Sequence, residues 1–439
     1  MTDNKNSNGI ETGGRREHAV AAHTRTLVVC PTVTRGENAR SPEARREEAV
    51  GLAAAIDLAV VGSVLVTLGE IRPATYLGKG KVEELAARVK DEEIALVVMD
   101  CALSPVQQRN LEKAFAAKVI DRTGLILEIF GRRARTAEGS LQVELAHLDY
   151  QKSRLVRSWT HLERQRGGFG FLGGPGETQI ETDRRLIQER MIRIKHDLEQ
   201  VKKTRALHRE SRKQVPIPIV ALVGYTNAGK STLFNRLTHA HVVAADMLFA
   251  TLDPTMRSVK LPHGGTAILS DTVGFISDLP TMLISAFRAT LEEVLAADVI
   301  LHVRDISHVD AGAQAEDVEA ILADLGVTET DEKLIEVWNK VDRLDEAHRS
   351  ALGSSAHEAV AVSALTGEGL GELMAVIEAR LARGRRTVDL DLDGADGQSV
   401  HWLYEHTEVM ARRDDADGRV HMTVRAAPDA MARLKRKFA

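Results

Sequence analysis

The feature that most constrains the fold is a glycine-rich loop between an apolar run and a helical segment. Ile217–Val223 has the length and composition of a buried strand, and Thr232–Thr238 follows a helical pattern. Between them stands the run Gly224-Tyr-Thr-Asn-Ala-Gly-Lys-Ser231. A strand, a tight glycine loop and a helix in this order are typical of a P-loop domain, in which phosphate binds at the helix N-terminus. The sequence therefore predicts an α/β fold with a mainly parallel sheet.

Each part of this loop has a chemistry suited to phosphate. Gly224 and Gly229 let backbone N–H groups approach phosphate oxygens closely. Lys230 places a positive charge on the β- and γ-phosphates, and the Ser231 hydroxyl is a Mg²⁺ ligand. The alternative, a glycine turn without function, requires strand, loop and helix to coincide by chance. We therefore expect a nucleoside triphosphate with Mg²⁺ here.

A second motif predicts which base is bound. Asn339-Lys-Val-Asp342 directly follows the apolar run Leu334–Val337. The Asp342 carboxylate can accept hydrogen bonds from guanine N1–H and from the exocyclic N2 amine, and adenine has neither donor on that edge. Ser363-Ala-Leu365 follows another apolar run, 360–362, where it can support the guanine. The nucleotide is therefore expected to be GTP or GDP.

A third motif, Asp271-Thr-Val-Gly274, follows the apolar run Thr266–Ser270. We expect Asp271 to hold Mg²⁺ through a water molecule. The Gly274 N–H should contact the γ-phosphate and release it after hydrolysis. With four elements in this order along the chain, the sequence predicts a GTPase.

A threonine that completes the Mg²⁺ shell is expected between the loop and this third motif. The run Phe249-Ala-Thr-Leu-Asp-Pro-Thr255 offers two hydroxyls, those of Thr251 and Thr255. Both are chemically suitable, and the spacing by itself does not choose between them.

Two residues of the expected site raise separate questions. Phe275 follows Gly274, where many GTPases place a glutamine that orients the attacking water. A phenyl ring cannot do this, so we expect slow intrinsic hydrolysis that a partner or another residue completes. Asn227 could orient a monovalent cation such as K⁺ against the phosphates. It could equally be an asparagine that serves only the turn.

The rest of the chain divides into four further parts. Residues 1–24 are expected to form a disordered tail, and 25–138 a small parallel α/β domain. Its strands are expected at 26–30, 63–68, 94–99 and 119–120, and its helices at 42–59, 79–90, 105–117 and 122–133. The GTPase domain is expected at 214–385, with further strands at 299–303 and 334–337. Residues 386–439 predict a small α+β domain of strand, helix, hairpin with a turn at 414–418, and a basic terminal helix.

The pattern of residues 139–213 predicts an antiparallel helical hairpin. Leu141, Leu145, Leu148, Lys152, Leu155, Trp159 and Leu162 form one heptad seam, and Ile187, Met191, Ile194, Leu198 and Val201 form a second. Between the seams, residues 167–176 contain six glycines and a proline, which no helix tolerates. The hairpin is therefore expected to have a flexible, glycine-rich tip.

The second helix of this hairpin is strongly basic. Residues 184–213 contain eleven lysines and arginines and four acidic residues, whereas the whole chain has a net charge of −5. A charged helix pair is often only a solvated coiled coil. Two phenylalanines in the tip favour RNA, because arginines can follow phosphates while aromatic rings stack on unpaired bases. The RNA-binding residues we expect are Arg166, Gly168, Phe169, Phe171, Arg193, Lys202 and Arg205.

The composition of the chain indicates the cellular compartment in which the protein is expected. The chain contains only two cysteines, Cys30 and Cys101, so a disulfide framework is not expected. No apolar stretch reaches the roughly 20 residues that span a bilayer, and the polar N-terminus is unlike a signal peptide. We expect a cytoplasmic monomer. The turn Gly78-Lys-Gly-Lys81 could bind a second phosphate group, or could simply start a helix.

Together these motifs resemble the HflX GTPases. The resemblance is carried by the phosphate loop, Phe-Ala-Thr-Leu-Asp253, Asp-Thr-Val-Gly-Phe-Ile276, the run 167–183 with its glycine-rich tip, and Tyr76-Leu-Gly-Lys-Gly-Lys-Val82. It covers roughly residues 25–385. The resemblance implies that Thr251 is the Mg²⁺ threonine, and that the glycine-rich tip reaches towards the peptidyl-transferase centre. An ATP-dependent RNA-unwinding activity of the N-terminal domain, ascribed to some members, has no support here beyond the Gly78–Lys81 turn.

The resemblance also implies a function. Such proteins bind the large ribosomal subunit and its rRNA and split stalled or idle ribosomes, and we expect the ribosome to stimulate hydrolysis. The alternative is a GTP-dependent rRNA-binding assembly factor. The expected catalytic residues are Lys230, Thr251 and Gly274, and the expected metal ligands are Ser231, Thr251 and, through water, Asp271. The expected nucleotide contacts are Gly224, Tyr225, Thr226, Asn227, Ala228, Gly229, Lys230, Ser231, Phe249, Ala250, Thr251, Leu252, Asp253, Asp271, Thr272, Val273, Gly274, Asn339, Lys340, Val341, Asp342, Ser363, Ala364 and Leu365.

Overall fold

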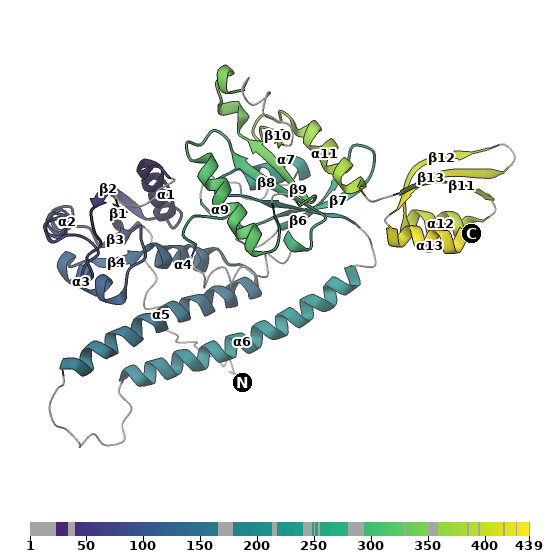
Figure 1. The fold of residues 1–439 in the computed structure, drawn as a ribbon. Helices are drawn as coiled ribbons and strands as arrows, with labels where there is room; N and C mark the ends of the chain where they lie inside the picture. The colour runs from purple at the N-terminus through teal and green to yellow at the C-terminus, as the bar shows by residue number, and fades with distance from the viewer. Residues whose placement is uncertain are drawn as a thin grey trace, which may run out of the picture.

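Three separate sheets and one long helical hairpin make up the described part of the chain (Figure 1). The computed structural model describes residues 23–33, 40–165, 179–212, 217–239, 248–249, 251–252, 255–279, 294–328, 331–349, 359–383, 386–393, 396–415, 418–426 and 428–438. The predicted tail up to residue 22 and the predicted glycine-rich tip lie outside these residues.

The N-terminal sheet is fully parallel, with the strand order β2-β1-β3-β4. Its strands are β1 (Arg25–Val33), β2 (Ala59–Leu68), β3 (Leu96–Met99) and β4 (Lys118–Asp121). Its helices are α1 (Pro42–Ala54), α2 (Lys79–Asp91), α3 (Pro105–Phe115) and α4 (Arg122–Arg133). The predicted small parallel α/β arrangement is therefore confirmed.

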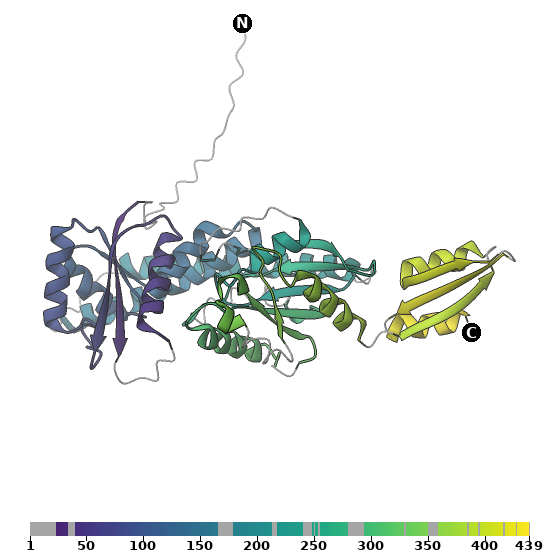
Figure 2. The ribbon, with the colours of Figure 1, turned by 90° about the horizontal axis from the view of Figure 1, so that it is seen from above.

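Alternate residues of β1 serve opposite faces of this sheet. Leu27 and Val29 pack with α2 and α3, whereas Val28 and Cys30 pack with α1 and α4. Figure 2 shows the helices on both sides of the sheet. A strand buried on both faces reads as a continuous apolar run, which is why the sequence pattern was clear here.

Helix α1 is shorter than predicted. It ends at Ala54 rather than near residue 59, and β2 begins at Ala59. Side chains of α4 take the place of helical partners for the last carbonyls. Arg133 donates to the Ala55 oxygen at 3.0 Å and Arg132 to the Ile56 oxygen at 2.7 Å. These long-range caps satisfy the end of the helix, and no local pattern predicts them.

The predicted hairpin consists of α5 (Ala137–Gln165) and α6 (Gln179–Arg212), which pack against each other (Figure 1). In α6 the predicted seam is correct, since Met191, Ile194 and Leu198 are buried. In α5 the described residues of the predicted seam are half-buried, namely Leu141, Leu145, Leu148, Lys152 and Leu155. Among the residues with described side chains, the buried apolar ones are Val143 and Ala146, which belong to a cluster with α4. α5 packs against α3 and α4 as well as α6, so more than one of its faces is covered.

The central sheet has six strands in the order β10-β9-β8-β5-β7-β6. They are β5 (Ile219–Val223), β6 (Thr255–Lys260), β7 (Thr266–Asp271), β8 (Val299–Asp305), β9 (Leu334–Asn339) and β10 (Ala359–Ala361). Its helices are α7 (Lys230–Thr238), α9 (Ala311–Asp324) and α11 (Leu370–Ala382), with a short 3₁₀ turn η1 (Val341–Arg343). β6 was not predicted. It is a polar edge strand, antiparallel to β7, so it lacks the continuous apolar run of the parallel strands.

This sheet positions the site because five of its strands are parallel. Their carboxyl ends meet at one edge, where the loops after β5, β7, β9 and β10 carry the predicted motifs. α7 and α11 pack on one face of the sheet and α9 on the other. We call residues 217–383 the nucleotide domain.

The C-terminal domain is the predicted small α+β unit. Its antiparallel sheet has the order β11-β13-β12, with strands Arg386–Asp393, Arg419–Ala426 and Glu408–Asp414 in that order. α12 (Gly397–His406) and the basic α13 (Pro428–Phe438) pack on one face through Leu403, Met431 and Leu434. Figure 1 shows both helices on the same side of this sheet.

Candidate functional site

The phosphate loop, residues Gly224–Ser231, runs from β5 into α7 and lies close to neighbouring strands. Gly224 has a φ of 147°, and a Cβ there would lie 2.1 Å from the Val303 carbonyl oxygen of β8. Gly229 has a φ of 94°, and a Cβ there would lie 2.2 Å from the Asn339 side-chain nitrogen. Only glycine fits these two positions, so the first and last glycines of the motif serve both conformation and packing.

Replacing Gly224 with alanine should displace this loop and weaken GTP binding by about 10- to 100-fold, given backbone strain of about 1–3 kcal/mol. Titration with a fluorescent guanine nucleotide measures the loss. Gly312→Ala is the matched control, because a Cβ at that helical position meets nothing within 4 Å. Equal affinities for the two variants would contradict a tightly constrained loop.

Lys230 lies at the phosphate end of the loop and is buried. Its Nζ donates to the carbonyl oxygens of Gly224 at 3.0 Å and Tyr225 at 2.7 Å. Burial lowers the pKa of this amine to about 8, with Asp271 acting in the opposite direction. Because burial disfavours the charged amine, anionic oxygens placed here would be strongly stabilising.

The three predicted metal ligands meet at one oxygen atom. The Ser231 hydroxyl donates to Asp271 Oδ2 at 2.7 Å, the Thr251 hydroxyl donates to the same oxygen at 2.9 Å, and the two hydroxyl oxygens lie 2.9 Å apart. The other carboxylate oxygen, Oδ1, is buried without a partner among the described residues. Burial raises the pKa of Asp271, and the hydrogen bonds from Ser231 and Thr251 and the charge of Lys230 offset this only in part. This oxygen-rich donor set fits Mg²⁺.

Thr255, the alternative hydroxyl, lies in β6. Its backbone pairs with that of Asp271 in the antiparallel register, so the position of Thr255 is fixed by the strand pairing. Thr251, by contrast, brings its hydroxyl into the cluster with Ser231. The geometry therefore favours Thr251, the residue that the family resemblance implied.

The predicted base-binding residues converge at the ends of β9 and β10. Asn339 donates to the Ala228 carbonyl at 2.8 Å and accepts from the Ala364 N–H at 3.0 Å, which ties the phosphate loop to the last motif. The Asp342 carboxylate accepts from the Ser363 hydroxyl at 2.6 Å. Leu365 is 70% exposed at this edge. Asp342 is thus held in place by the residue that the sequence assigned to supporting the guanine.

The Asp271–Gly274 segment is bonded directly to the phosphate loop. The Thr226 N–H donates to the Phe275 carbonyl at 2.7 Å, and the Phe275 N–H donates to the Gly224 carbonyl at 3.1 Å. A Cβ at Gly274 would lie 3.0 Å from Lys230 Nζ. Gly274 is therefore placed at the phosphate end of the site.

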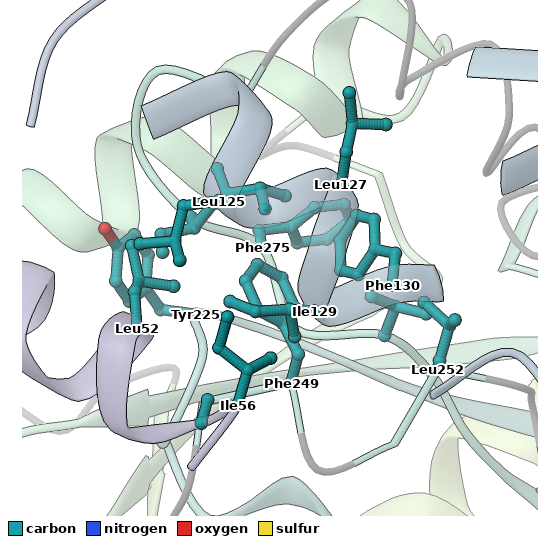
Figure 3. Packing of buried hydrophobic residues seen from close by; sticks show 14 of the residues in the cluster. Leu52, Ile56, Leu125, Leu127, Ile129, Phe130, Tyr225, Phe249, Leu252 and Phe275 are labelled. Carbon is teal, nitrogen blue, oxygen red and sulfur yellow. The ribbon is translucent and has the colours of Figure 1, made fainter. Parts of the chain in front are cut away.

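The Phe275 ring is buried among apolar side chains, so it does not position a water molecule. It is 5% exposed and belongs to an apolar cluster shared by the nucleotide domain and the N-terminal domain. Phe249 belongs to the same cluster, and its ring meets Phe130 of α4 edge-on at 4.7 Å (Figure 3). Arg133 also donates to the Phe249 carbonyl at 2.9 Å. We call the segment around Phe249 and the segment after Asp271 the switch segments, and both are covered by α1 and α4.

Sequence reasoning missed this cover and its polar rim. Arg40, Glu48 and Arg122 contact Tyr225 and Ser277 of the nucleotide domain. No local signal could have found them, because a charged residue in a helical pattern usually faces solvent.

Some predicted residues stand exposed or have another partner, and others lie outside the described residues. Asn227 is exposed in the phosphate loop, with a φ of 60° that suits an asparagine in a turn. Lys340 pairs with Asp305 at 2.7 Å. Ala250 and Asp253 lie outside the described residues, as do Arg166, Gly168, Phe169 and Phe171 of the tip.

Comparison with known proteins decides the family. Four family models match successive parts of the chain: "GTP-binding GTPase N-terminal" at 43–131, "GTP-binding GTPase Middle Region" at 133–212, "50S ribosome-binding GTPase" at 219–340 and "HflX C-terminal domain" at 350–439. A GTPase HflX of Magnetococcus marinus is 51% identical over 389 residues, 89% of either chain. The chain belongs to the HflX family.

A second curated relative agrees with this membership. A GTPase HflX of Escherichia coli K12 is 46% identical over 355 residues, 80% of this chain and 83% of that protein. The chain also resembles a GTP-binding protein of Sulfolobus solfataricus solved in complex with GDP, at 22% identity and a TM-score of 0.45, over 82% of this chain and 99% of that one.

HflX membership makes the chain a P-loop GTPase, as the motifs predicted. P-loop GTPases generally use Mg²⁺ with their nucleotide, which agrees with the donor set around Asp271. Within the described residues, no helix is long and apolar enough to cross a membrane.

Proposed function

We propose that this HflX-family GTPase binds the large ribosomal subunit and splits stalled or idle ribosomes into subunits. The observation that carries the proposal is a basic hairpin joined to the nucleotide domain. α6 ends at Arg212 and β5 begins at Ile219, so movement of the nucleotide domain would reach the hairpin through a short connection.

The exposed side of α6 supports an RNA partner. Its buried seam packs on α5, and outside the seam the helix presents exposed basic side chains, namely Arg184, Arg185, Arg193, Lys195 and Lys203. Lys and Arg rows of this kind bind phosphate backbones. The matching family model is described as a 50S ribosome-binding GTPase, which supports ribosomal RNA as the source of these phosphates.

The glycine-rich tip would complete this interface. Phe169 and Phe171 could stack on unpaired bases while Arg166 and Arg193 neutralise phosphates. Lys202 and Arg205 extend the same basic helix towards the nucleotide domain. Binding would therefore run along the hairpin rather than at one point.

The contacts around the nucleotide follow from the site geometry. Lys230 would neutralise the β- and γ-phosphates, Ser231 and Thr251 would hold Mg²⁺ directly, and Asp271 would hold it through water. A bound metal ion would neutralise negative charge on the phosphate oxygens. The Gly274 N–H would contact the γ-phosphate, and Asp342 would read the guanine edge.

The ribosome would complete the hydrolytic site. Phe275 offers no hydrogen bond to an attacking water, and its ring is buried under α4. A water-positioning group must then come from elsewhere, and the bound ribosome is the partner that can supply it. GTP turnover should therefore rise on ribosomes.

Sedimentation of intact ribosomes with the protein and GTP tests the proposal. Wild type should convert ribosomes into subunits, whereas a variant with Arg193→Glu, Lys195→Glu and Lys203→Glu should bind at least about tenfold more weakly, because phosphate contacts are lost. Guanine-nucleotide binding should be retained by this variant. The measurement is the fraction of subunits in a sucrose gradient.

A charge swap is the matched control. Arg190 pairs with Glu144 at 2.7 Å, so Arg190→Glu with Glu144→Arg keeps both the pair and the net charge of the hairpin. This control should split ribosomes like wild type. Intact ribosomes at saturating wild type would rule out splitting and favour an assembly factor. Unchanged binding of the triple variant would show that the basic face is only solvated surface.

A further inference from the structure

A buried polar cluster joins the N-terminal domain to both halves of the phosphate site. The Tyr225 hydroxyl, on the second residue of the phosphate loop, donates to Glu48 Oε2 at 2.5 Å. The Tyr225 hydroxyl oxygen in turn accepts from the Ser277 N–H at 2.9 Å and from Arg40 Nη1 at 2.9 Å. One hydroxyl therefore links α1, the phosphate loop and the segment after Gly274.

Arg122 closes the cluster from the other side. Its Nη2 donates to Glu48 Oε1 and, at 3.1 Å, to the Ser277 carbonyl, while its Nη1 donates to Asp100 at 2.6 Å. The Ser277 hydroxyl accepts from Arg40 Nη1 at 2.6 Å. Both backbone polar groups of Ser277 are thus bonded to this cluster.

The charges in this cluster are buried and matched. Arg122 is 4% exposed, and the Glu48 side chain is 8% exposed. Burial on its own would raise the pKa of Glu48, but Arg122 and Arg40 outweigh it and hold that pKa below its usual range. Removing one partner of such a pair leaves the other uncompensated, so the cluster tolerates little displacement.

The cluster fixes the segment that carries Gly274 at two points. On one side, Phe275 is bonded by its backbone to Thr226 and Gly224 of the phosphate loop. On the other, Ser277 is held by Tyr225 and Arg122. Gly274 lies immediately before these anchors, and a Cβ there would lie 2.9 Å from the Thr226 Cα and 3.0 Å from Lys230 Nζ.

We propose that Tyr225, Glu48, Arg122 and Ser277 are positioning residues through which the N-terminal domain sets the preference of the site for GTP over GDP. The proposal rests on the role assigned above to the Gly274 N–H. That N–H is used by a γ-phosphate and not by GDP. A segment already held in place loses less conformational entropy when it binds, so the cluster favours GTP selectively.

Linkage makes this coupling reciprocal. If docking of the N-terminal domain strengthens the hold on GTP, then GTP strengthens the docking of the N-terminal domain by the same factor. Loss of the γ-phosphate would loosen the contact of Ser277 with Arg122 and Glu48. The N-terminal domain would thereby report which nucleotide is bound.

Tyr225→Phe tests the proposal, because it removes one hydroxyl and keeps the ring in the apolar cluster. The ratio of the dissociation constants for GDP and a non-hydrolysable GTP analogue, measured by fluorescence on the full chain without ribosomes, should fall about 5- to 10-fold. Ser277→Ala should shift the ratio in the same direction by a smaller factor. Amide hydrogen exchange in α1 and α4 should be slower with the GTP analogue than with GDP in wild type, and alike in the variant.

Tyr150→Phe is the matched control. The Tyr150 hydroxyl also donates to a buried carboxylate, Asp121, at 2.6 Å, and this bond joins α5 to the residue before α4 instead of to the phosphate loop. This variant should lower the melting temperature as Tyr225→Phe does while leaving the nucleotide ratio within about twofold of wild type. An unchanged ratio in both Tyr225→Phe and Ser277→Ala, or a ratio that rises, would overturn the proposal. The ribosome-splitting proposal would be untouched, because this assay contains no ribosomes.

Discussion

Asp342→Asn should weaken GTP binding by about 10²–10⁴-fold. Two hydrogen bonds from guanine to a carboxylate are charge-assisted, and each is worth about 1.5–3 kcal/mol. An asparagine carries no charge, and its amide presents a donor to the N2 amine, which is itself a donor. Since the Ser363 hydroxyl holds Asp342 in place at 2.6 Å, the loss should not be recovered by a shift of the side chain.

Competition between nucleotides measures this effect. The variant should gain affinity for xanthine nucleotides, whose O2 accepts from an amide, and should lose its preference for GTP over ATP. Asp345→Asn is the control, because that carboxylate is exposed and bonds to His348 on the same turn. If Asp342→Asn keeps full selectivity for GTP over ATP, the assignment of base recognition to Asp342 is wrong.

The second large effect is expected from the switch threonine. Thr251→Val should lower GTP hydrolysis by about 10²-fold, since metal neutralisation of transition-state charge is worth several kcal/mol and the variant removes a proposed direct ligand of the metal. Valine keeps the shape of threonine, so the buried position beside Asp271 remains filled.

Thr255→Val provides the matched comparison. It makes the same substitution at the threonine four residues later, in β6, and should leave GTP turnover within about threefold of wild type. Single-turnover hydrolysis as a function of Mg²⁺ concentration separates the two variants, because only Thr251→Val should require more metal. If Thr255→Val is the more damaging change, the metal assignment belongs to β6 instead.

Patterns that depend on neighbours along the chain were predicted well. α4 begins at Arg122 and ends at Arg133 as expected, because its apolar helical pattern starts directly after a buried strand. The strand β6 was missed, since an edge strand exposed on one side carries only isolated apolar residues such as Val259. The further packing of α5 was not predicted for a related reason. The helix packs against α3 and α4 as well as α6, and a heptad pattern anticipates one partner.

The cover over the switch segments could not be predicted. Phe130 and Phe249 are far apart in sequence, and each is only an apolar residue in its own segment. Glu48 and Arg122 look like surface charges until the fold buries them together. Such pairings depend on how two domains dock, and docking is set by the summed shape and charge of two surfaces rather than by any local spacing.

The sequence by itself determined the chemistry. Phosphate loops, base-reading carboxylates and metal hydroxyls need particular residue types at short, fixed spacings, so Gly224–Ser231, Asp271 and Asp342 are legible along the chain. The tertiary structure alone decided how the parts are joined. It bonded the hydroxyl of Thr251, rather than that of Thr255, to the Asp271 carboxylate, and it placed Phe275 and Ser277 under the N-terminal domain. These contacts join residues that only a folded backbone brings within hydrogen-bonding distance, which is why no spacing in the sequence reveals them.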